Sequence, residues 1–325
     1  MSVLVYIENV EGKFKKSSFE IISYAKAISS KLNLPLITLS IGSVLPDELQ
    51  KTSQYGSSKI LNCDVDAADA LNPQSNASII TEAAKSEKST IVVMTAGFSG
   101  KNIAPRVAVK LDAALAENVI EIPSMNESFI VKKGAFSGKA FCFIEMNSDI
   151  KVISVLPNSY KAIINPDEAK IIPFKCGRNE NDFTAKIIES KRSSDKISLP
   201  DAELVVSAGR GMKGPENWGM IEELANILGA ATACSKPVSD SGWRPHSEHV
   251  GQTGIAISPN LYIAIGISGA IQHLAGVSSS KVIVVINKDP EVPFFKAADY
   301  GIIGDAFEVV PELINAAKIF KANQN

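Results

Sequence analysis

The stretch Leu261–Asn287, LYIAIGISGAIQHLAGVSSSKVIVVIN, decides the fold. An apolar run, Leu261–Ile265, is followed by a turn of small residues, Gly266–Gly269, and then by a short helical pattern, Ala270–Ala275. A second apolar run, Lys281–Ile286, closes the stretch. This order predicts strand, turn, helix and strand, which is the βαβ unit of a parallel sheet.

The turn of this unit is suited to an anion. Its backbone N–H groups lie at the N-terminus of a helix, where free N–H groups and the helix dipole attract a phosphate. Gln272 and His273 interrupt otherwise apolar sequence, and polar groups in such a place need partners in the protein or in a ligand. The stretch is therefore a candidate nucleotide-binding element.

The composition is that of a globular protein large enough for two domains. The chain has 325 residues, of which 45% are hydrophobic and 21% charged, and its formal net charge is -2. Because no basic block is present, we expect no nucleic-acid binding. No apolar run is long enough to span a bilayer, and the first residues resemble neither a signal nor a transit peptide. We therefore expect a prokaryotic, cytoplasmic protein without direct membrane insertion.

The cysteines and histidines give little support for a metal site. The four cysteines are far apart in sequence and form no CxxC pair. His246 and His249 have Glu248 between them but lack the spacing of metal ligands. We expect four buried thiols and no bound metal.

Alternating strand and helix patterns predict an α/β fold with two domains, each built on a mainly parallel sheet. We expect the first domain at residues 1–190, a linker at 191–200, where the sequence is polar and charged, and the second domain at 201–325. Within the first domain the pattern predicts a helix over Lys101–Ala116 and a strand over Val119–Glu121.

Two regions depart from the regular alternation. After Pro123, three short runs (Ser128–Lys133, Ala140–Ile144 and Lys151–Pro157) predict antiparallel strands that extend or cap the first sheet. In the second domain a polar loop is expected over Lys236–Thr253, and loops of that length are usually functional.

Gly209–Gly214, GRGMKG, has the form GxGxxG and lies between a predicted strand and a predicted helix. A dinucleotide fingerprint also needs an acidic residue about twenty residues later to hold a ribose. There the chain has Cys234, Ser235 and Lys236, so simple NAD binding is disfavoured. A tight glycine turn without a ligand stays open, although Arg210 within it favours an anion.

Further polar groups follow other predicted strands. The turn Val250–Gly254, VGQTG, has two glycines that permit close backbone approach, or it is an ordinary polar turn. Asn287 follows a strand at the carboxyl end, where ligands bind in open α/β sheets. Asp305 follows the next strand, where it would hold a ribose hydroxyl or cap a helix.

Several of these motifs occur in order and at matching spacing: SAGRG from Ser207, VGQTG from Val250, LYIAIGISGAIQHLAG from Leu261, INKDP from Ile286 and ADYGI from Ala298. Together they resemble the alpha subunit of electron-transfer flavoprotein, the ETF alpha or FixB family. The resemblance is specific over Leu204–Pro311 and weaker over the first half of the chain.

The resemblance implies a heterodimer with an electron-transfer flavoprotein beta subunit, in which the alpha subunit holds one FAD. It implies an electron carrier that does not transform a substrate by itself. Electrons would come from flavin dehydrogenases, such as the acyl-CoA dehydrogenases of fatty acid beta-oxidation, and pass to a membrane quinone reductase. The N-terminal domain would be Rossmann-like, similar to adenine nucleotide hydrolases, with extra antiparallel strands. The C-terminal domain would be doubly wound and bind FAD.

Carried over position by position, the resemblance implies these FAD contacts: Arg210, Ser235, Lys236, Val250, Gly251, Gln252, Thr253, Gly254, Ser268, Gly269, Ala270, Ile271, Gln272, His273, Asn287 and Asp305. Thr253 would lie near flavin N5, His273 near the N1/O2 edge, and Asn287 and Asp305 beside the ADP half. The family usually has arginine at the position of Lys236, so the positive charge is kept but the planar guanidinium is lost.

Three alternatives remain open at the level of the sequence. The chain could be the alpha subunit of an electron-bifurcating flavoprotein, with another FAD in the beta subunit. It could be a non-redox nucleotide-binding scaffold module on the same kind of sheet. An NAD-dependent dehydrogenase is disfavoured because the acidic residue that would hold the ribose is missing.

Overall fold

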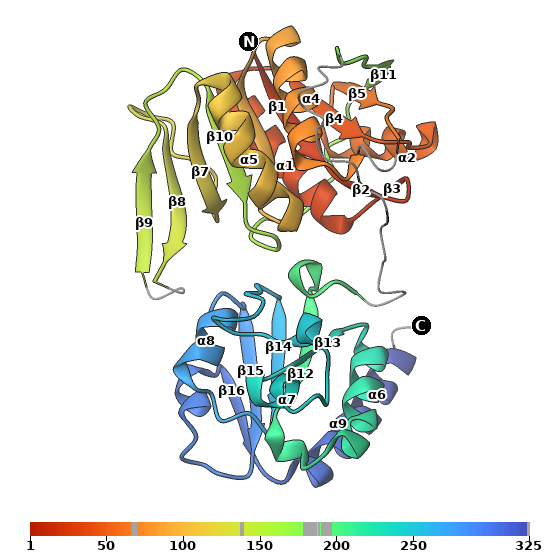
Figure 1. Ribbon diagram of the computed structural model, residues 1–325, viewed down its shortest axis with the longest axis vertical. Helices are drawn as coiled ribbons and strands as arrows, with labels where there is room; N and C mark the ends of the chain where they lie inside the picture. Colours follow the sequence, from red (N-terminus) through yellow and green to blue (C-terminus); the bar gives the residue numbers. More distant parts are fainter. Residues whose placement is uncertain (67–69, 137–139, 178–186, 188, 190–196, 324–325) are drawn as a thin grey trace. The chain divides into compact units, whose positions relative to one another are not determined.

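The structure, a computed structural model, describes residues 1–323 except 67–69, 137–139, 178–186, 188 and 190–196 (Figure 1). The chain divides into two compact units, one within residues 1–192 and one formed mainly by residues 193–325. Each is an α/β unit with its own mainly parallel sheet, which confirms the predicted fold class. Residues 191–196 of the predicted linker lie outside the described residues, and the domain bounds stay a prediction.

The first unit is built on a nine-stranded sheet in the order β11-β5-β4-β1-β6-β10-β7-β8-β9 (Figure 1). Its strands are β1 (Ser2–Ile7), β4 (Leu36–Ile41), β5 (Lys59–Cys63), β6 (Ser89–Thr95), β7 (Ala114–Val119), β8 (Ile130–Ala135), β9 (Ala140–Glu145), β10 (Lys151–Val155) and β11 (Lys170–Pro173), and β2 (Asn9–Val10) with β3 (Lys13–Phe14) forms a separate hairpin.

The central strand β1 is buried on both faces, as its unbroken apolar sequence requires. Val3, Val5 and Ile7 belong to the core beneath helix α1 (Lys16–Leu32). Leu4 and Tyr6 belong to the opposite core, beneath helices α4 (Pro73–Ser86) and α5 (Phe98–Leu111). The first unit is therefore a three-layered α/β/α structure. A short helix α2 (Pro46–Gln50) and a 3-10 turn at Lys51–Tyr55 precede β5.

Three predictions for residues 101–157 are wrong. The expected helix Lys101–Ala116 ends at Leu111, because Asp112 takes a left-handed conformation (φ 52°) and caps the helix. Strand β7 consequently starts at Ala114 and not at Val119. The last of the three runs, β10, is not antiparallel but lies parallel between β6 and β7. All its residues after the first are buried, so neither face of this strand is exposed to solvent, as is usual for a parallel strand. Strand β8 does pair antiparallel with β7.

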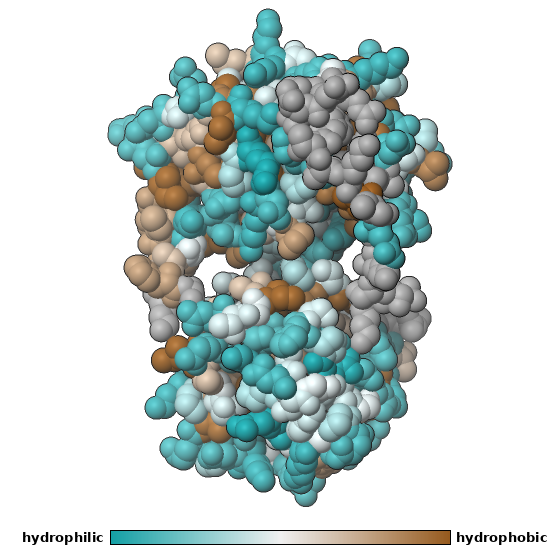
Figure 2. All heavy atoms as spheres, viewed as in Figure 1, coloured by the Kyte–Doolittle hydropathy of each residue, from teal (hydrophilic) through white to brown (hydrophobic). Residues whose placement is uncertain are grey.

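The expected burial of all four cysteines is also wrong. Cys63 and Cys234 are buried, but Cys176 is half-buried and Cys142 is exposed. The reason is that Cys142 lies on β9, the last strand at one edge of the sheet, where Phe141 (59% exposed) and Phe143 (68% exposed) also face solvent. Figure 2 shows apolar side chains on the surface in the region where Figure 1 has β8 and β9.

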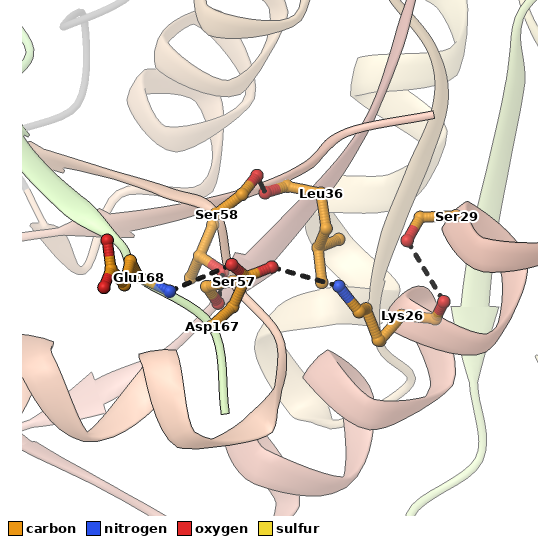
Figure 3. Close-up of polar contacts among 8 residues, drawn as sticks. Lys26, Ser29, Leu36, Ser57, Ser58, Asp167 and Glu168 are labelled. Carbon is orange, nitrogen blue, oxygen red and sulfur yellow. Dashed lines mark hydrogen bonds and ion pairs between the residues drawn. The ribbon is translucent and has the colours of Figure 1, made fainter. Parts of the chain in front are cut away.

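The segment between β10 and β11 is fastened to α1. Asp167 forms an ion pair with Lys26 on α1, with 3.2 Å between Nζ and Oδ2 (Figure 3). Its backbone N–H donates to the carbonyl of Ser53 at 3.0 Å. Nearby, the hydroxyl of Ser58 donates to the carbonyl of Leu36 at 2.8 Å (Figure 3). The contacts of Asp167 hold the segment that precedes β11. Strand β11 pairs parallel with β5, and the sequence pattern did not predict it.

The second unit is built on a five-stranded sheet in the order β13-β12-β14-β15-β16, with every pair parallel. Its strands are β12 (Leu204–Ala208), β13 (Ala231–Cys234), β14 (Leu261–Ile265), β15 (Val282–Asn287) and β16 (Tyr300–Ile303), and its helices are α6 (Gly219–Leu228), α7 (Lys236–Asp240), α8 (Ile271–Val277) and α9 (Ala306–Ala322). Helices α6 and α9 cover one face of the sheet, and α8 and the connecting loops cover the other.

The loop predicted over Lys236–Thr253 is partly regular. It begins with α7, whose second residue Pro237 suits a helix start, and it contains a 3-10 turn at His246–Glu248. Further along, α9 begins at Ala306, before the predicted start at Pro311. None of the described helices is long and apolar enough to cross a membrane.

Candidate functional site

The sheet of the second unit has a single natural place for a ligand. The chain passes from β12 to β13 on one side and then to β14 on the other, so the order of strands reverses between β12 and β14. In open α/β sheets, ligands bind outside the carboxyl ends of the strands at such a switch point. The carboxyl ends meet there, because Ala208 of β12 pairs in register with Ile265 of β14.

Two glycine turns meet backbone to backbone at this switch point. A Cβ atom on Gly209 would lie 2.4 Å from the carbonyl oxygen of Gly266, and one on Gly211 would lie 2.6 Å from the Cα of Gly266. Gly266 itself has φ +60°, which favours glycine. The first two glycines of GRGMKG, Gly209 and Gly211, are therefore required by the packing of one turn on the other. Arg210 is left exposed between them.

The turn Val250–Gly254 lies on the start of α8. The N–H of Gln252 donates to the carbonyl of Gln272 at 2.7 Å. Gly251 has φ +152°, and a Cβ on Gly276 would lie 2.6 Å from its Cα. Val250 and Gly251 are buried, whereas the three residues that follow them in the turn are exposed. The amide of Gln252 and the hydroxyl of Thr253 are thus open to a ligand.

His273, the residue predicted near the flavin edge, is buried in an aromatic cluster. Its Nε2 lies 2.8 Å from the hydroxyl of Tyr262, and its ring meets that of Phe294 edge-on at 5.8 Å. Burial, with a smaller contribution from the charge of His249, lowers the pKa of His273 to about 4. Its Nδ1 is buried and has no hydrogen-bond partner among the described residues. The imidazole is therefore neutral near pH 7 and keeps one unmatched polar atom.

The cations of the site follow adjacent strands. Arg210 comes after β12 and Lys236 after β13, and the last residues of these strands, Ala208 and Cys234, pair in register. Lys236 lies 3.8 Å from Asp240 one helical turn away, but both side chains are more than half exposed, so this pair is weak. Both cations are available to an anionic ligand.

The two residues assigned to the ADP half already have structural roles. The amide of Asn287 donates to the carbonyl of Ile267 at 3.1 Å, and its oxygen accepts from the N–H of Asp289 at 3.1 Å. Asp305 caps α9 by accepting from the N–H of Phe307 at 3.0 Å. Both lie at the carboxyl end of the sheet, and their contact with a nucleotide stays a prediction.

Comparison with known proteins gives the same division of the chain. Residues 3–175 match the model described as the electron transfer flavoprotein domain, and residues 198–278 match the electron transfer flavoprotein FAD-binding domain. The electron transfer flavoprotein subunit alpha of Thermoanaerobacterium thermosaccharolyticum is 34% identical over 324 residues, which cover 98% of each chain. That of Pseudomonas aeruginosa is 35% identical over 97% of this chain and 100% of its own length.

The chain belongs to the electron-transfer flavoprotein alpha-subunit family. Protein FixB of Clostridium saccharobutylicum is a further relative, 33% identical over 97% of this chain and 96% of its own. The cofactor of this electron-transfer flavoprotein alpha chain is FAD, as the matched FAD-binding domain shows. That match, over residues 198–278, includes Arg210 and His273 and stops before Asn287 and Asp305.

The residues present fit FAD. Two closely packed glycine turns lie at the switch point, exposed cations follow β12 and β13, and the Nδ1 of His273 is buried without a hydrogen-bond partner among the described residues. The sixteen predicted residues come from the carboxyl ends of strands and the turns that follow them, from the first residue of α7, from the Val250–Gly254 turn or from α8. No group of three or more described His, Cys, Asp and Glu side chains is placed to hold a metal ion.

The sequence prediction missed a clamp that fixes the loop before Val250. Arg244 donates from Nε and Nη2 to the two carboxylate oxygens of Glu248, both at 2.7 Å, and from Nη1 to Glu222 on α6 at 2.8 Å. Its guanidinium lies 5.5 Å from the ring of Trp218. Hydrogen bonding to Glu248 raises the pKa of Arg244. The i, i+4 spacing of Arg244 and Glu248 was the signal available in the sequence.

Proposed function

We propose that this chain is the FAD-bearing alpha subunit of a heterodimeric electron carrier. It accepts electrons from flavin dehydrogenases, such as acyl-CoA dehydrogenases, and delivers them to a membrane quinone reductase. The observation that supports this most is the coincidence of the FAD-binding domain match with the glycine-lined switch point of the second unit. The match of residues 3–175 to the electron transfer flavoprotein domain supports a partnership with a beta subunit.

The chain's own residues supply binding and electrostatics. FAD, when bound, carries the one- and two-electron chemistry. The Gly266–Gly269 turn precedes α8, where backbone N–H groups would meet a diphosphate, and Arg210 and Lys236 add positive charge. Because His273 is neutral near pH 7, it acts on the flavin as a hydrogen-bonding group and not as a fixed charge.

The test is the content and reactivity of the complex with the beta subunit. We expect the purified heterodimer to be yellow, to contain one FAD, and to be reduced by an acyl-CoA dehydrogenase with its substrate. Two flavins per heterodimer would favour an electron-bifurcating flavoprotein instead. A heterodimer that stays colourless after addition of FAD would overturn the proposal and favour a nucleotide-binding scaffold.

A further inference from the structure

A buried tyrosine lies directly behind the histidine of the candidate site. Tyr262 is fully buried on β14, and its hydroxyl lies 2.8 Å from Nε2 of His273 on α8. Phe294 packs against both rings, at 6.3 Å from the Tyr262 ring and 5.8 Å from the His273 ring. The imidazole is thus held on one side by a hydrogen bond and on another by an aromatic ring.

The hydrogen bond between Tyr262 and His273 has a preferred direction. Burial raises the pKa of Tyr262, so its hydroxyl keeps its proton. Among the described residues, Nε2 of His273 lies within hydrogen-bond distance of the phenol hydroxyl, at 2.8 Å, and can accept its hydrogen. The reverse bond would leave the phenol hydrogen without an acceptor in the core, which is unfavourable.

We propose that Tyr262 is a positioning residue for the flavin site: its hydroxyl donates to Nε2 of His273 and so places the single imidazole proton on Nδ1. Nδ1–H is then a buried donor without a hydrogen bond of good geometry to the described residues, although the nearby backbone of Val250 acts to raise the pKa of the imidazole, and it is available to an acceptor atom of FAD. Tyr262 itself touches only the protein. The inference rests on the proposed function, because the donor has a use only if His273 meets the cofactor.

A neutral imidazole has two tautomers, and the bond made by one nitrogen decides which proton the other carries. Without Tyr262, Nε2 would be free to take the proton and Nδ1 would become an acceptor. An acceptor cannot stabilise negative charge on a reduced flavin edge, whereas an N–H donor can. Tyr262 would therefore act on the cofactor through the tautomer of His273.

The test reads the tautomer directly. Nitrogen-15 NMR of histidine-labelled heterodimer distinguishes protonated from unprotonated ring nitrogens, and the His273 signals are assigned by their loss in His273→Gln. In the wild-type protein we expect a proton on Nδ1 and none on Nε2. In Tyr262→Phe we expect a proton to appear on Nε2, FAD to bind about fivefold more weakly, and the flavin potential to fall.

Tyr24→Phe is the matched control. Tyr24 is fully buried in the first unit, and its hydroxyl makes a comparable bond, to the carbonyl of Glu121 at 3.0 Å. The control should leave the His273 tautomer, the FAD affinity and the potential unchanged.

Two results would overturn the inference: a wild-type spectrum with the proton on Nε2 of His273, or a Tyr262→Phe spectrum and potential equal to wild type. The wild-type spectrum decides the first of these even if the variant fails to fold. Failure of the proposed function looks different. A colourless heterodimer overturns that function and the flavin role of Tyr262 with it, whereas a yellow heterodimer with the wrong tautomer overturns only the role of Tyr262.

Discussion

Removing the guanidinium of Arg244 should lower the free energy of unfolding of the second unit more than removing any exposed cation of that unit. The side chain of Arg244 is 14% exposed and that of its bidentate partner Glu248 is 7% exposed. Arg244→Ala leaves the Glu248 carboxylate buried without its cation, and breaking such a pair costs about 3 kcal/mol. The lost contact with Glu222, which is 43% exposed, adds at most about 0.5 kcal/mol.

Urea unfolding of the FAD-loaded heterodimer, followed by flavin fluorescence and far-UV circular dichroism, measures this loss. A double-mutant cycle with Glu248→Gln separates the pair from its surroundings, and we expect a coupling free energy of about 2 kcal/mol. Lys318→Ala is the matched control. Lys318 joins α9 to Glu223 on α6 at 2.8 Å, but both side chains are at least half exposed, so its loss should cost less than about 0.5 kcal/mol.

The reasoning would be refuted by either of two results. If Arg244→Ala costs no more stability than Lys318→Ala, burial of the Glu248 charge is not the controlling term. Alternatively, the Arg244 and Glu248 changes could add independently, which would show that the two side chains do not act as a pair. We also expect FAD to dissociate faster from the Arg244→Ala protein, because the contacts of Arg244 hold the loop that leads into Val250.

Three further predictions concern the site itself. Gly211→Ala should abolish or strongly weaken FAD binding, because its Cβ would lie 2.6 Å from the Cα of Gly266, whereas Gly219→Ala, with open space around the new Cβ, should bind FAD normally by fluorescence titration. Burial lowers the pKa of His273 from 6.5 to about 4. The unfolded chain therefore takes up the proton first as the pH falls, so the contribution of His273 to the free energy of unfolding should be fully present above about pH 6.5. It should fall by about 3 kcal/mol as the pH drops toward 4. His273→Gln should flatten that acid limb in urea titrations across pH, and an unchanged limb would count against the burial of a neutral imidazole. Lys236→Arg should keep FAD bound but shift its potential, since a guanidinium stacks where an ammonium does not, and potentials equal to wild type in a spectral titration would rule this out.

The parts of the fold that were predictable are those whose partners are close in sequence. The βαβ unit at Leu261–Asn287 was predicted because its two strands and its turn are contiguous, and neighbouring strands in such a unit pair with each other. Strand β10 was placed wrongly because its pairing with β6 and β7 joins segments far apart in the chain. A five-residue apolar run has no period that distinguishes a central parallel strand from an antiparallel one.

The candidate site divides in the same way. Glycine-rich turns and exposed cations are visible as motifs, and the structure places Arg210, Lys236 and the Val250–Gly254 turn at the ligand-binding end of the sheet. Tyr262 was not visible, because a tyrosine in an apolar strand looks like ordinary core until its hydroxyl is seen to meet His273. The role of Arg244 was missed because Arg244 lies in a loop and its second partner, Glu222, lies on helix α6, twenty-two residues earlier.

The GRGMKG motif acts here through sterics, since the N–H groups of Gly209, Gly211, Met212, Lys213 and Gly214 donate to carbonyls within the protein. Gly209 and Gly211 have no room for a Cβ because they meet Gly266, and Gly276 has none because it meets Gly251. These contacts tie together the turns that follow β12 and β14 and the turn that lies on α8. A side chain at any of these positions would separate two of the turns at once, so a single glycine substitution should disturb cofactor contacts on elements that it does not belong to. In this chain the glycine pattern meets Gly266 on the neighbouring turn, and about twenty residues later it lacks the acidic residue that an NAD-binding fingerprint needs for the ribose.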